Sequence, residues 1–321
     1  MAPSSTEIAA NAVGARARIQ QFIYQTPLIP AQKVGKSDGA TVLFKAENFQ
    51  LTGSFKIRGA MSKMSTSAAN KSLITASSGN HGVGAALAAK TFGRSLTVVL
   101  PETVVPAKLE KIKSYGVEVI LHGQETGLAE RHAQELAASG AYEYISPYND
   151  IDIISGQATI GIEILEQCGH VDNIFISVGG GGLISGVASV IKDAKPATKI
   201  YGVSAVNSRA LAESIAAGKV VETKHLPTIA EAVAGGIDYD TITLPLAMSV
   251  VDHLIDCREE EIISAMKEMA FDEHMIVEGS AALALAGFRR VAPSLAGQTS
   301  IILLCGANVG VPGMKEIIFP T

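Results

Sequence analysis

The chain has 321 residues, of which 47% are hydrophobic and 18% charged, enough for a large core or for two lobes that share an interface. Its net charge of −5 excludes the basic surface typical of nucleic-acid-binding proteins. Cys168, Cys257 and Cys305 are too far apart for a disulfide framework or a zinc site, and no run of about 18 apolar residues predicts a membrane span. We therefore expect a cytoplasmic protein that binds a small molecule and neither nucleic acid nor membrane.

Short β-branched runs alternate with helical patterns along the chain. An amphipathic helix opened by Ser and Thr is expected within residues 1–23. The predicted strands that follow are 42–47, 72–78, 95–100, 117–122, 143–148, 173–179, 199–206 and 300–305. The helices predicted between them include 79–93, 106–116 and 259–274. This alternation indicates an α/β protein with parallel-rich sheets flanked by helices.

The domain organisation follows from where the strand–helix units restart. Residues 71–148 contain a self-sufficient run of such units, and a second set begins after "SPYNDIDIISGQAT". We predict two lobes with a cleft between them. Residues 1–70 and 149–321 form a discontinuous large domain, and residues 71–148 form a small mobile domain. The same pattern suits many Rossmann-like proteins, so the fold alone does not decide the function.

A run of four glycines lies between an apolar strand and a helix. In "ISVGGGGLISG", Gly179, Gly180, Gly181 and Gly182 can turn their amides inward, and the helix N-terminus behind them favours an anion. A dinucleotide fingerprint fails, because its third glycine would fall on Ile184 or Ser185. The run therefore favours a single phosphate over a nucleotide; a loop that is tight only for packing is the alternative.

A second loop has the same position in "ITASSGNHGVGAA". Ser77, Ser78, Gly79, Asn80 and His81 offer backbone amides with hydroxyl, amide and imidazole groups at a helix N-terminus, which suits a carboxylate. The plain alternative is a helix cap with a Ser/Asn turn, common at strand–helix junctions.

One lysine in "TGSFKIRGA", Lys56, falls where a buried turn meets a helix. An apolar site disfavours the charged form of an amine. Burial of Lys56 is tolerable if its amine is condensed with an aldehyde as a Schiff base. Together with a phosphate cradle and a carboxylate-binding loop, this predicts pyridoxal 5′-phosphate, an electron sink for carbanions, as the cofactor.

These motifs give the chain a family resemblance over nearly its whole length. The segments "ARIQQFIYQTPL", "KAENFQLTGSFKIRGA", "SSGNHG", "SGQAT", "SVGGGGLISG" and "LLCGANVG" occur in this order. The chain resembles the fold-type-II pyridoxal-phosphate enzymes of the serine/threonine dehydratase and serine racemase family. The resemblance implies the two-lobed, tryptophan synthase β-like fold, and a homodimer as the expected assembly.

The resemblance also implies roles for residues of this chain. Lys56 would form the Schiff base, with Phe55 packed against the pyridine ring and Asn80 hydrogen-bonded to the ring's 3′-oxygen. The amides from Gly179 to Leu183 would hold the phosphate, and Ser77 to His81 the substrate carboxylate. The phosphate would thus be bound by Gly179, Gly180, Gly181, Gly182 and Leu183, and the substrate carboxylate by Ser77, Ser78, Gly79, Asn80 and His81.

The resemblance implies roles for two further residues. Cys305 would face the pyridine nitrogen, where a neutral thiol favours prompt loss of a β-leaving group; taken by itself, Cys305 is better interpreted as a small buried hydrophobe at a strand end. Ser78 lies where serine racemases keep the acid/base for the second face of Cα.

The chain departs from the family pattern in two places. The family's divalent-cation site uses a Glu and an Asp six residues apart, but "GVSAVNSRAL" supplies Ser204 and Ala210 instead, so we expect no metal. Near the expected cofactor ring, Glu231-Ala232 replaces an Asp-Gly pair of many relatives, and Tyr148 is large for the cleft edge. Both changes leave the size of the substrate open.

The expected activity is therefore that of a lyase, an ammonia-lyase that eliminates water from L-threonine, L-serine or a relative to give a 2-oxo acid and ammonia. An amino-acid racemase with side dehydratase activity is the alternative. Less favoured are a dehydratase for a bulkier or acidic 3-hydroxy amino acid and a non-catalytic relative, against which the intact Lys56 argues.

Overall fold

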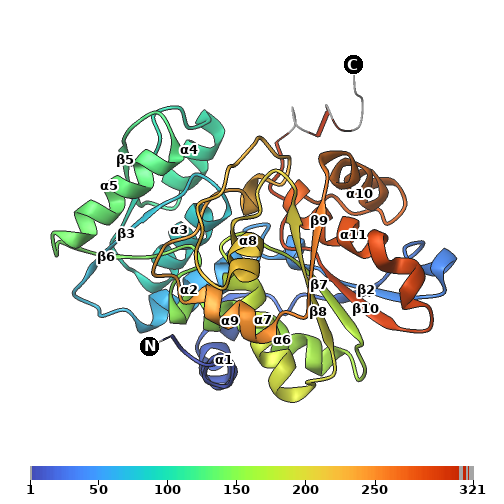
Figure 1. Ribbon diagram of the computed structural model, residues 1–321. Coiled ribbons are helices and arrows are strands. Elements are labelled where there is room, and N and C mark those ends of the chain that lie inside the picture. The colour runs from blue at the N-terminus through green and yellow to red at the C-terminus, as the bar shows by residue number, and fades with distance from the viewer. Residues whose placement is uncertain (1, 311–313, 316, 318–321) are drawn as a thin grey trace.

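The computed structural model describes residues 2–310, 314–315 and 317, and it arranges them around two sheets (Figure 1). The predicted large domain extends to residues 1 and 318–321, which lie outside this described part. The larger sheet has six strands in the order β1-β2-β10-β7-β8-β9, and the smaller has four in the order β5-β4-β3-β6. All pairs are parallel except β1 with β2. The predicted α/β class with parallel-rich sheets is confirmed.

The strands of the larger sheet come from both ends of the chain and from its middle. They are β1 (Leu28–Pro30), β2 (Thr41–Lys45), β7 (Asn173–Ser177), β8 (Lys199–Ala205), β9 (His253–Cys257) and β10 (Thr299–Leu303). The strands of the smaller sheet are consecutive: β3 (Ser72–Ala76), β4 (Leu96–Leu100), β5 (Glu118–Leu121) and β6 (Tyr142–Tyr144). Strands β1 and β9 were not predicted. Both are edge strands with half-exposed patterns, and β1 has only three residues and ends in proline, so neither carries a strong strand signal.

Eleven helices of the described chain connect and cover these sheets. They are α1 (Ser5–Ile19), α2 (Lys56–Thr66), α3 (Asn80–Phe92), α4 (Pro106–Lys113), α5 (Thr126–Ala138), α6 (Ile151–Gln167), α7 (Gly182–Ala194), α8 (Ala210–Ala217), α9 (Thr243–Val250), α10 (Glu259–Phe271) and α11 (Gly279–Val291). Within residues 2–310, 314–315 and 317, none is long and apolar enough to cross a membrane. Helices α1, α6 and α7 pack together, and α11 lies against β7, β8 and β10.

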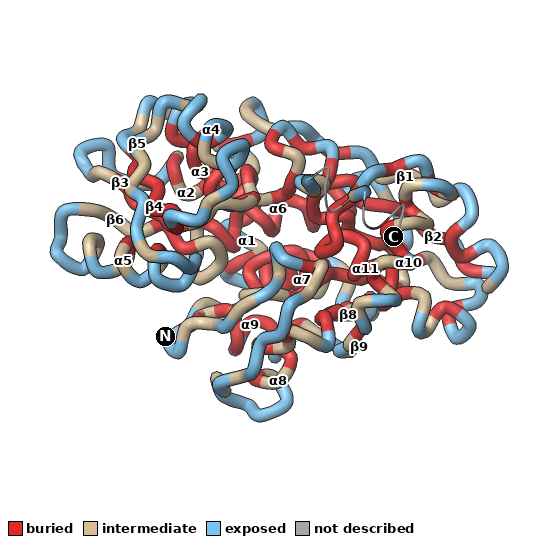
Figure 2. Tube along the Cα trace, turned by 90° about the horizontal axis from the view of Figure 1, so that it is seen from above, coloured by how far each residue is buried: buried red, intermediate tan, exposed pale blue. Residues whose placement is uncertain are grey.

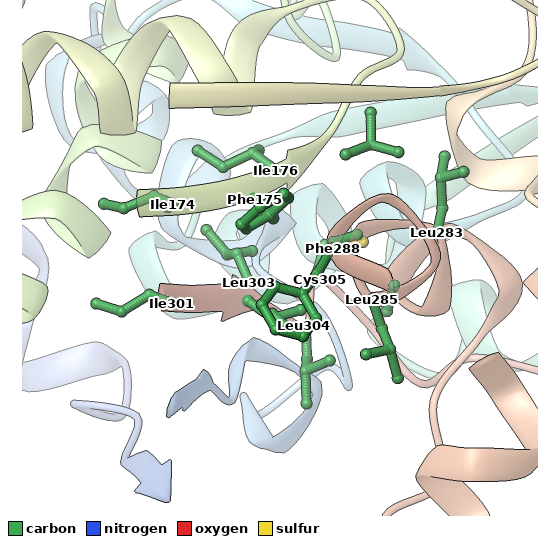
Figure 3. Packing of buried hydrophobic residues seen from close by; sticks show 14 of the residues in the cluster. Ile174, Phe175, Ile176, Leu283, Leu285, Phe288, Ile301, Leu303, Leu304 and Cys305 are labelled. Carbon is green, nitrogen blue, oxygen red and sulfur yellow. The ribbon is translucent and has the colours of Figure 1, made fainter. Parts of the chain in front are cut away.

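The core is built from aliphatic side chains, as the composition requires. Figure 2 shows buried segments running through α6, α7 and α11, with exposed segments at the outer ends. Phe175 and Phe288 meet edge to face with ring centroids 5.5 Å apart, among Ile301, Leu303 and the other side chains of Figure 3. Helix α11 approaches the sheet closely because Gly287 has no side chain: a Cβ there would lie 2.5 Å from the Val203 side chain. Helix α11 is thereby packed directly against the larger sheet.

Helix α2, which begins at Lys56, is held against α6 by two glycines. A Cβ on Gly156 would lie 2.6 Å from the Cα of Gly59, so any larger residue would separate the helices. The next residue, Gln157, accepts a hydrogen bond from the backbone amide of Gly59 at 3.2 Å. This bond joins a side chain of α6 directly to the backbone of the first turns of α2. The "SGQAT" motif thus anchors the helix that carries Lys56.

A fully buried ion cluster fixes the other side of α2. Arg58 donates to Glu47 at 2.7 and 2.8 Å and to Glu163 at 2.6 and 2.9 Å, and Lys45 donates to Glu163 at 2.6 Å. None of these four side chains is more than 3% exposed. Two cations balance two carboxylates, as the interior requires. The cluster joins α2, α6 and β2 two residues away from Lys56.

Removing one member of this cluster should be costly. We expect Arg58→Met to lower the free energy of unfolding by about 3–5 kcal/mol, because it leaves two buried carboxylates short of one cation. Urea unfolding, followed by circular dichroism, measures the change. Arg290→Met is the control: its pair with Glu261 is partly exposed, at 42% and 29%, and should contribute less than about 1 kcal/mol. Equal losses for both variants would contradict the expectation.

Candidate active site

Lys56 lies at the first position of α2, directly after a turn that two other segments hold in place. The backbone amide of Phe55 donates to the carbonyl of Cys305 at 3.1 Å, and the amide of Ala307 donates to the carbonyl of Gly53 at 2.8 Å. Gly53 has φ +74°, which favours glycine. The turn is therefore fixed to the segment that follows β10.

The Lys56 amine is half-buried and points to the junction of the two sheets. Its Nζ donates to the carbonyl of Pro147 at 2.8 Å and lies 5.3 Å from the ring centroid of Phe55. Burial lowers the pKa of Lys56 to about 8, against the opposing effect of the Glu278 carboxylate. A large fraction of this amine is therefore neutral, and nucleophilic, in mildly alkaline solution.

The glycine run forms a loop between β7 and α7 whose amides are unused. Gly181 precedes α7 with φ +90° and provides no side-chain cap. Among the residues that the structure describes, nothing accepts a hydrogen bond from the amides of Gly179 to Leu183. Five donors at a helix N-terminus fit an anion such as a phosphate group. The predicted phosphate residues therefore lie together, and no side chain of their own fills the space.

Neighbouring segments explain why this loop must be glycine. A Cβ on Gly180 would lie 2.5 Å from the ring of Tyr148, and one on Gly179 would lie 2.9 Å from the Cα of Val233. The Tyr148 hydroxyl accepts a hydrogen bond from the amide of Asp238 at 2.8 Å. Tyr148 is thus packed onto the glycine loop, and the segment after Glu231-Ala232 borders the same loop.

The second predicted loop connects β3 to α3 and also leaves amides free. Gly79 precedes the helix without a side-chain cap, and the Ser77 hydroxyl accepts from its amide at 3.2 Å. Ser78 is half-buried. Gly82 must lack a side chain, since a Cβ there would lie 1.9 Å from the carbonyl oxygen of Ser77. The backbone is therefore suited to bind a carboxylate.

The His81 side chain faces away from this loop, into the smaller sheet. Its Nε2 lies 3.0 Å from Thr75 Oγ1 and 3.3 Å from the carbonyl oxygen of Ile145. Burial, with the nearby Lys56, lowers the pKa of His81 to about 3, so the imidazole is neutral. The spacing "SSGNHG" gave no sign of this. The backbone amide is the group of His81 that remains for a ligand.

Asn80 and Cys305 meet a carboxylate that the sequence did not single out, that of Glu278. Asn80 Nδ2 donates to Glu278 Oε1 at 2.8 Å. Burial raises the pKa of Glu278 to about 7 and that of the Cys305 thiol well above its ordinary value, so Cys305 is a neutral thiol. The only sequence signal for Glu278 was an acidic residue before a helix, which usually marks a cap.

The chemistry of these groups fits pyridoxal phosphate. The structure brings together a half-buried amine, an uncapped anion loop, an amide side chain and a neutral thiol. They lie at the carboxyl ends of parallel strands or just beyond them, where α/β proteins place their ligands. They come from both sheets, so neither sheet alone completes the site.

The position where the family binds a cation is built differently. Ser204 and Ala210 are buried, at 1% and 5% exposure. Next to them, Arg209 forms ion pairs with Asp256 at 2.7 Å and with Glu213 at 2.8 Å. A single guanidinium already pairs with both of these carboxylates.

Comparison with known proteins supports the same chemistry. The family described as "Pyridoxal-phosphate dependent enzyme" matches residues 19–306. A catabolic L-threonine dehydratase of Staphylococcus aureus is 36% identical over 315 residues, covering 95% of this chain and 90% of that protein. The processed form of threonine deaminase isoform 2 from Solanum lycopersicum superposes with a TM-score of 0.93 at 30% identity, covering 99% of this chain and 89% of that one. Maize serine racemase superposes with a TM-score of 0.89 at 30% identity, covering 97% of this chain and 96% of that one.

The lowered pKa of Lys56 has a direct chemical consequence. We expect trace acetylation of the cofactor-stripped protein, quantified by mass spectrometry, to give Lys56 a pH midpoint near 8. Lys33 is the internal control, because its ion pair with the exposed Asp272 raises its pKa above 10.5. A Lys56 midpoint equal to that of Lys33 would mean that burial does not neutralise the amine.

Divalent cations should not stabilise this protein through the Ser204 region. We expect the same melting temperature in millimolar magnesium, calcium or EDTA, because a ligand stabilises only the fold that binds it. Arg209→Ala is the matched variant, since it frees the carboxylates of Asp256 and Glu213. A cation-induced rise in the unaltered protein would contradict the expectation.

Proposed function

The chain belongs to the pyridoxal-phosphate-dependent enzyme family, and on this basis we propose that it is an ammonia-lyase that eliminates water from L-threonine, L-serine or a related β-hydroxy amino acid. The products are a 2-oxo acid and ammonia. The observation that carries this proposal is the half-buried Lys56 amine, placed where the glycine loop, the Ser77–His81 loop and Cys305 converge. The printed activities of the bacterial relative and of the tomato structure support dehydration.

The residues that would hold the cofactor follow from the geometry. Lys56 would bind its aldehyde carbon covalently, and the amides of Gly179 to Leu183 its phosphate. Phe55 would lie against the ring, Asn80 would donate to the 3′-oxygen, and Cys305 would face the ring nitrogen. When bound, pyridoxal phosphate supplies an electron sink that makes the Cα proton of an amino acid acidic.

Proton transfer would fall to Lys56. Its amine is neutral in a large fraction of molecules near pH 8, so it can accept the Cα proton of the substrate as a general base. The neutral Cys305 thiol adds no charge beside it. Lowering the pH through this range would protonate the amine and remove the base.

Substrate orientation would come from the loop between β3 and α3. The amides of Ser77 to His81 would hold the substrate carboxylate at the N-terminus of α3. We also propose that residues 71–148 move as a small domain against residues 1–70 and 149–321. Its closure would exclude water around the reacting atoms.

Racemisation is the second candidate, and Ser78 is the observation that favours it. A two-base racemase needs a proton donor on each face of Cα. The half-buried Ser78 hydroxyl would serve the face opposite Lys56. The likeness in fold to maize serine racemase agrees with this, although the bacterial dehydratase shares more of the sequence.

The remaining proposals concern the setting of the enzyme. We propose a homodimer in the cytoplasm, in keeping with unpaired cysteines within the described residues. Light scattering tests the assembly.

Single enantiomers separate the two activities. We expect L-threonine and L-serine to release ammonia and 2-oxo acid faster than the opposite enantiomer forms. Lys56→Ala should abolish both reactions, by at least about 10³-fold, because it removes the covalent link and the base. Borohydride should fix a pyridoxyl group on Lys56 of the unaltered protein, and its absence there would contradict the covalent link.

Ser78→Ala is the variant that distinguishes the roles. It should spare elimination from L-substrates and abolish racemisation, because only the second face of Cα loses its donor. A panel of larger and acidic 3-hydroxy amino acids, assayed for ammonia, defines the substrate. Ammonia release from none of them would overturn the proposed lyase.

A further inference from the structure

A buried carboxylate, Glu278, joins the two sheets at the site without being needed by the chemistry proposed above. Its Oε1 accepts from Asn80 Nδ2 at 2.8 Å, and its Oε2 accepts from the backbone amide of Asn308 at 3.1 Å. Asn80 begins the helix next to the smaller sheet, whereas Glu278 and Asn308 flank the larger one. We propose that Glu278 is a positioning residue that fixes the side-chain amide of Asn80 so that its NH₂ group is presented to the cofactor ring.

The argument rests on the two ends of the Asn80 amide. A carboxylate such as that of Glu278 only accepts hydrogen bonds, so it selects the NH₂ end of Asn80. On the other side, Asn308 Nδ2 donates to Asn80 Oδ1 at 2.7 Å, which selects the oxygen end. A reversed Asn80 amide would place oxygen against carboxylate and NH₂ against NH₂. One orientation is therefore imposed, and one hydrogen of Asn80 Nδ2 stays free to donate.

The surroundings keep Glu278 in place. Asn80 and Glu278 are 8% and 7% exposed. Asn308 is fixed in turn, because its Nδ2 also donates to the carbonyl of Thr52 at 2.8 Å, in the turn before Lys56. A Cβ on Gly306 would lie 2.7 Å from Glu278 Oε1, so the carboxylate lies directly against the backbone after Cys305.

The position of Glu278 before α11 does not explain its side chain. A residue there usually caps its helix by accepting from the first amides, but Glu278 makes no such side-chain bond. Its carboxylate is turned across the junction instead, although burial raises its pKa to about 7 and thus opposes its charge. If the carboxylate capped the helix instead, it would lie nearer to solvent and its charge would carry a smaller desolvation penalty. This is the sign of a positioning role.

Glu278→Gln tests the role because it replaces one of the two accepting oxygens with an NH₂ group, which sets a donor against the donor of Asn80 or of Asn308. We expect the affinity of the stripped protein for pyridoxal phosphate, measured by equilibrium dialysis, to fall about tenfold, the equivalent of one lost hydrogen bond of about 1.4 kcal/mol. The visible absorption band of the bound cofactor should shift as well, as it should in Asn80→Ala. If Glu278→Gln does not fold, Glu278→Asp, which is too short to reach Asn80, takes its place with the same expectation.

A double-mutant cycle separates positioning from general support. If Glu278 acts through Asn80, then Asn80→Ala with Glu278→Gln should bind the cofactor within about threefold of Asn80→Ala alone, because coupled residues are not additive. If the two substitutions together lower the cofactor affinity by the product of their separate effects, the inference is overturned. An unchanged affinity in Glu278→Gln would overturn it as well.

Glu273→Gln is the matched control. Glu273 is 4% exposed and accepts three backbone amides, from Gln32, Lys33 and Val34, at 2.6–2.8 Å. The Glu273→Gln protein should lose stability in urea, as we also expect of Glu278→Gln, but it should keep its cofactor affinity. An equal loss of affinity in both variants would mean that Glu278 is merely structural. These readouts depend on cofactor binding and not on the substrate, so a failed ammonia assay with this pattern intact counts against the lyase proposal alone.

Discussion

The structure depends on holding one lysine amine in a half-buried position where a backbone carbonyl, that of Pro147, accepts its hydrogen bond. Lys56 achieves this by its place at the start of α2, where the preceding turn is hydrogen-bonded to the segment after β10. The helix behind it is held in place, because Gly59 and Gly156 bring α2 and α6 into backbone contact and Gln157 accepts a hydrogen bond from the amide of Gly59. The amine is therefore both neutralised by its surroundings and fixed in direction.

Two buried sets of charges serve this arrangement in opposite ways. Around Arg58 the cations and carboxylates balance, so the cluster is stable as a rigid support for α2. Near Lys56 the charges are suppressed instead: the His81 imidazole and the Cys305 thiol are both neutral because burial disfavours their charged forms. Burial also raises the pKa of Glu278, to about 7, and its hydrogen bonds from Asn80 and Asn308 oppose that rise.

The ligand-binding loops show why the site needs both sheets. Parallel strands end at one edge of a sheet, and each following helix presents free amides there. The glycine loop belongs to the larger sheet and the Ser77–His81 loop to the smaller, so a ligand that contacts both must lie at the junction. Asn80 and Tyr148 contact partners on the side of the larger sheet, at Glu278 and at the glycine loop. The geometry of the site is thus tied to the relation between the sheets.

Much of this protein can be read from the sequence, for identifiable reasons. Long apolar strands alternating with helices determined the α/β class, and eight strands were predicted because their β-branched runs are local signals. Glycines at strand ends marked the anion loop, and a lysine among small residues marked the reactive amine. The edge strands β1 and β9 were not predicted, because short, half-exposed strands lack such runs. Only the tertiary structure decided that His81 turns into the small sheet, that Arg58 joins a neutral cluster with Glu163, and that Glu278 reaches Asn80 across 198 positions of the chain. Contacts between distant residues depend on how helices and sheets pack, and no local pattern encodes the partner of a buried charge.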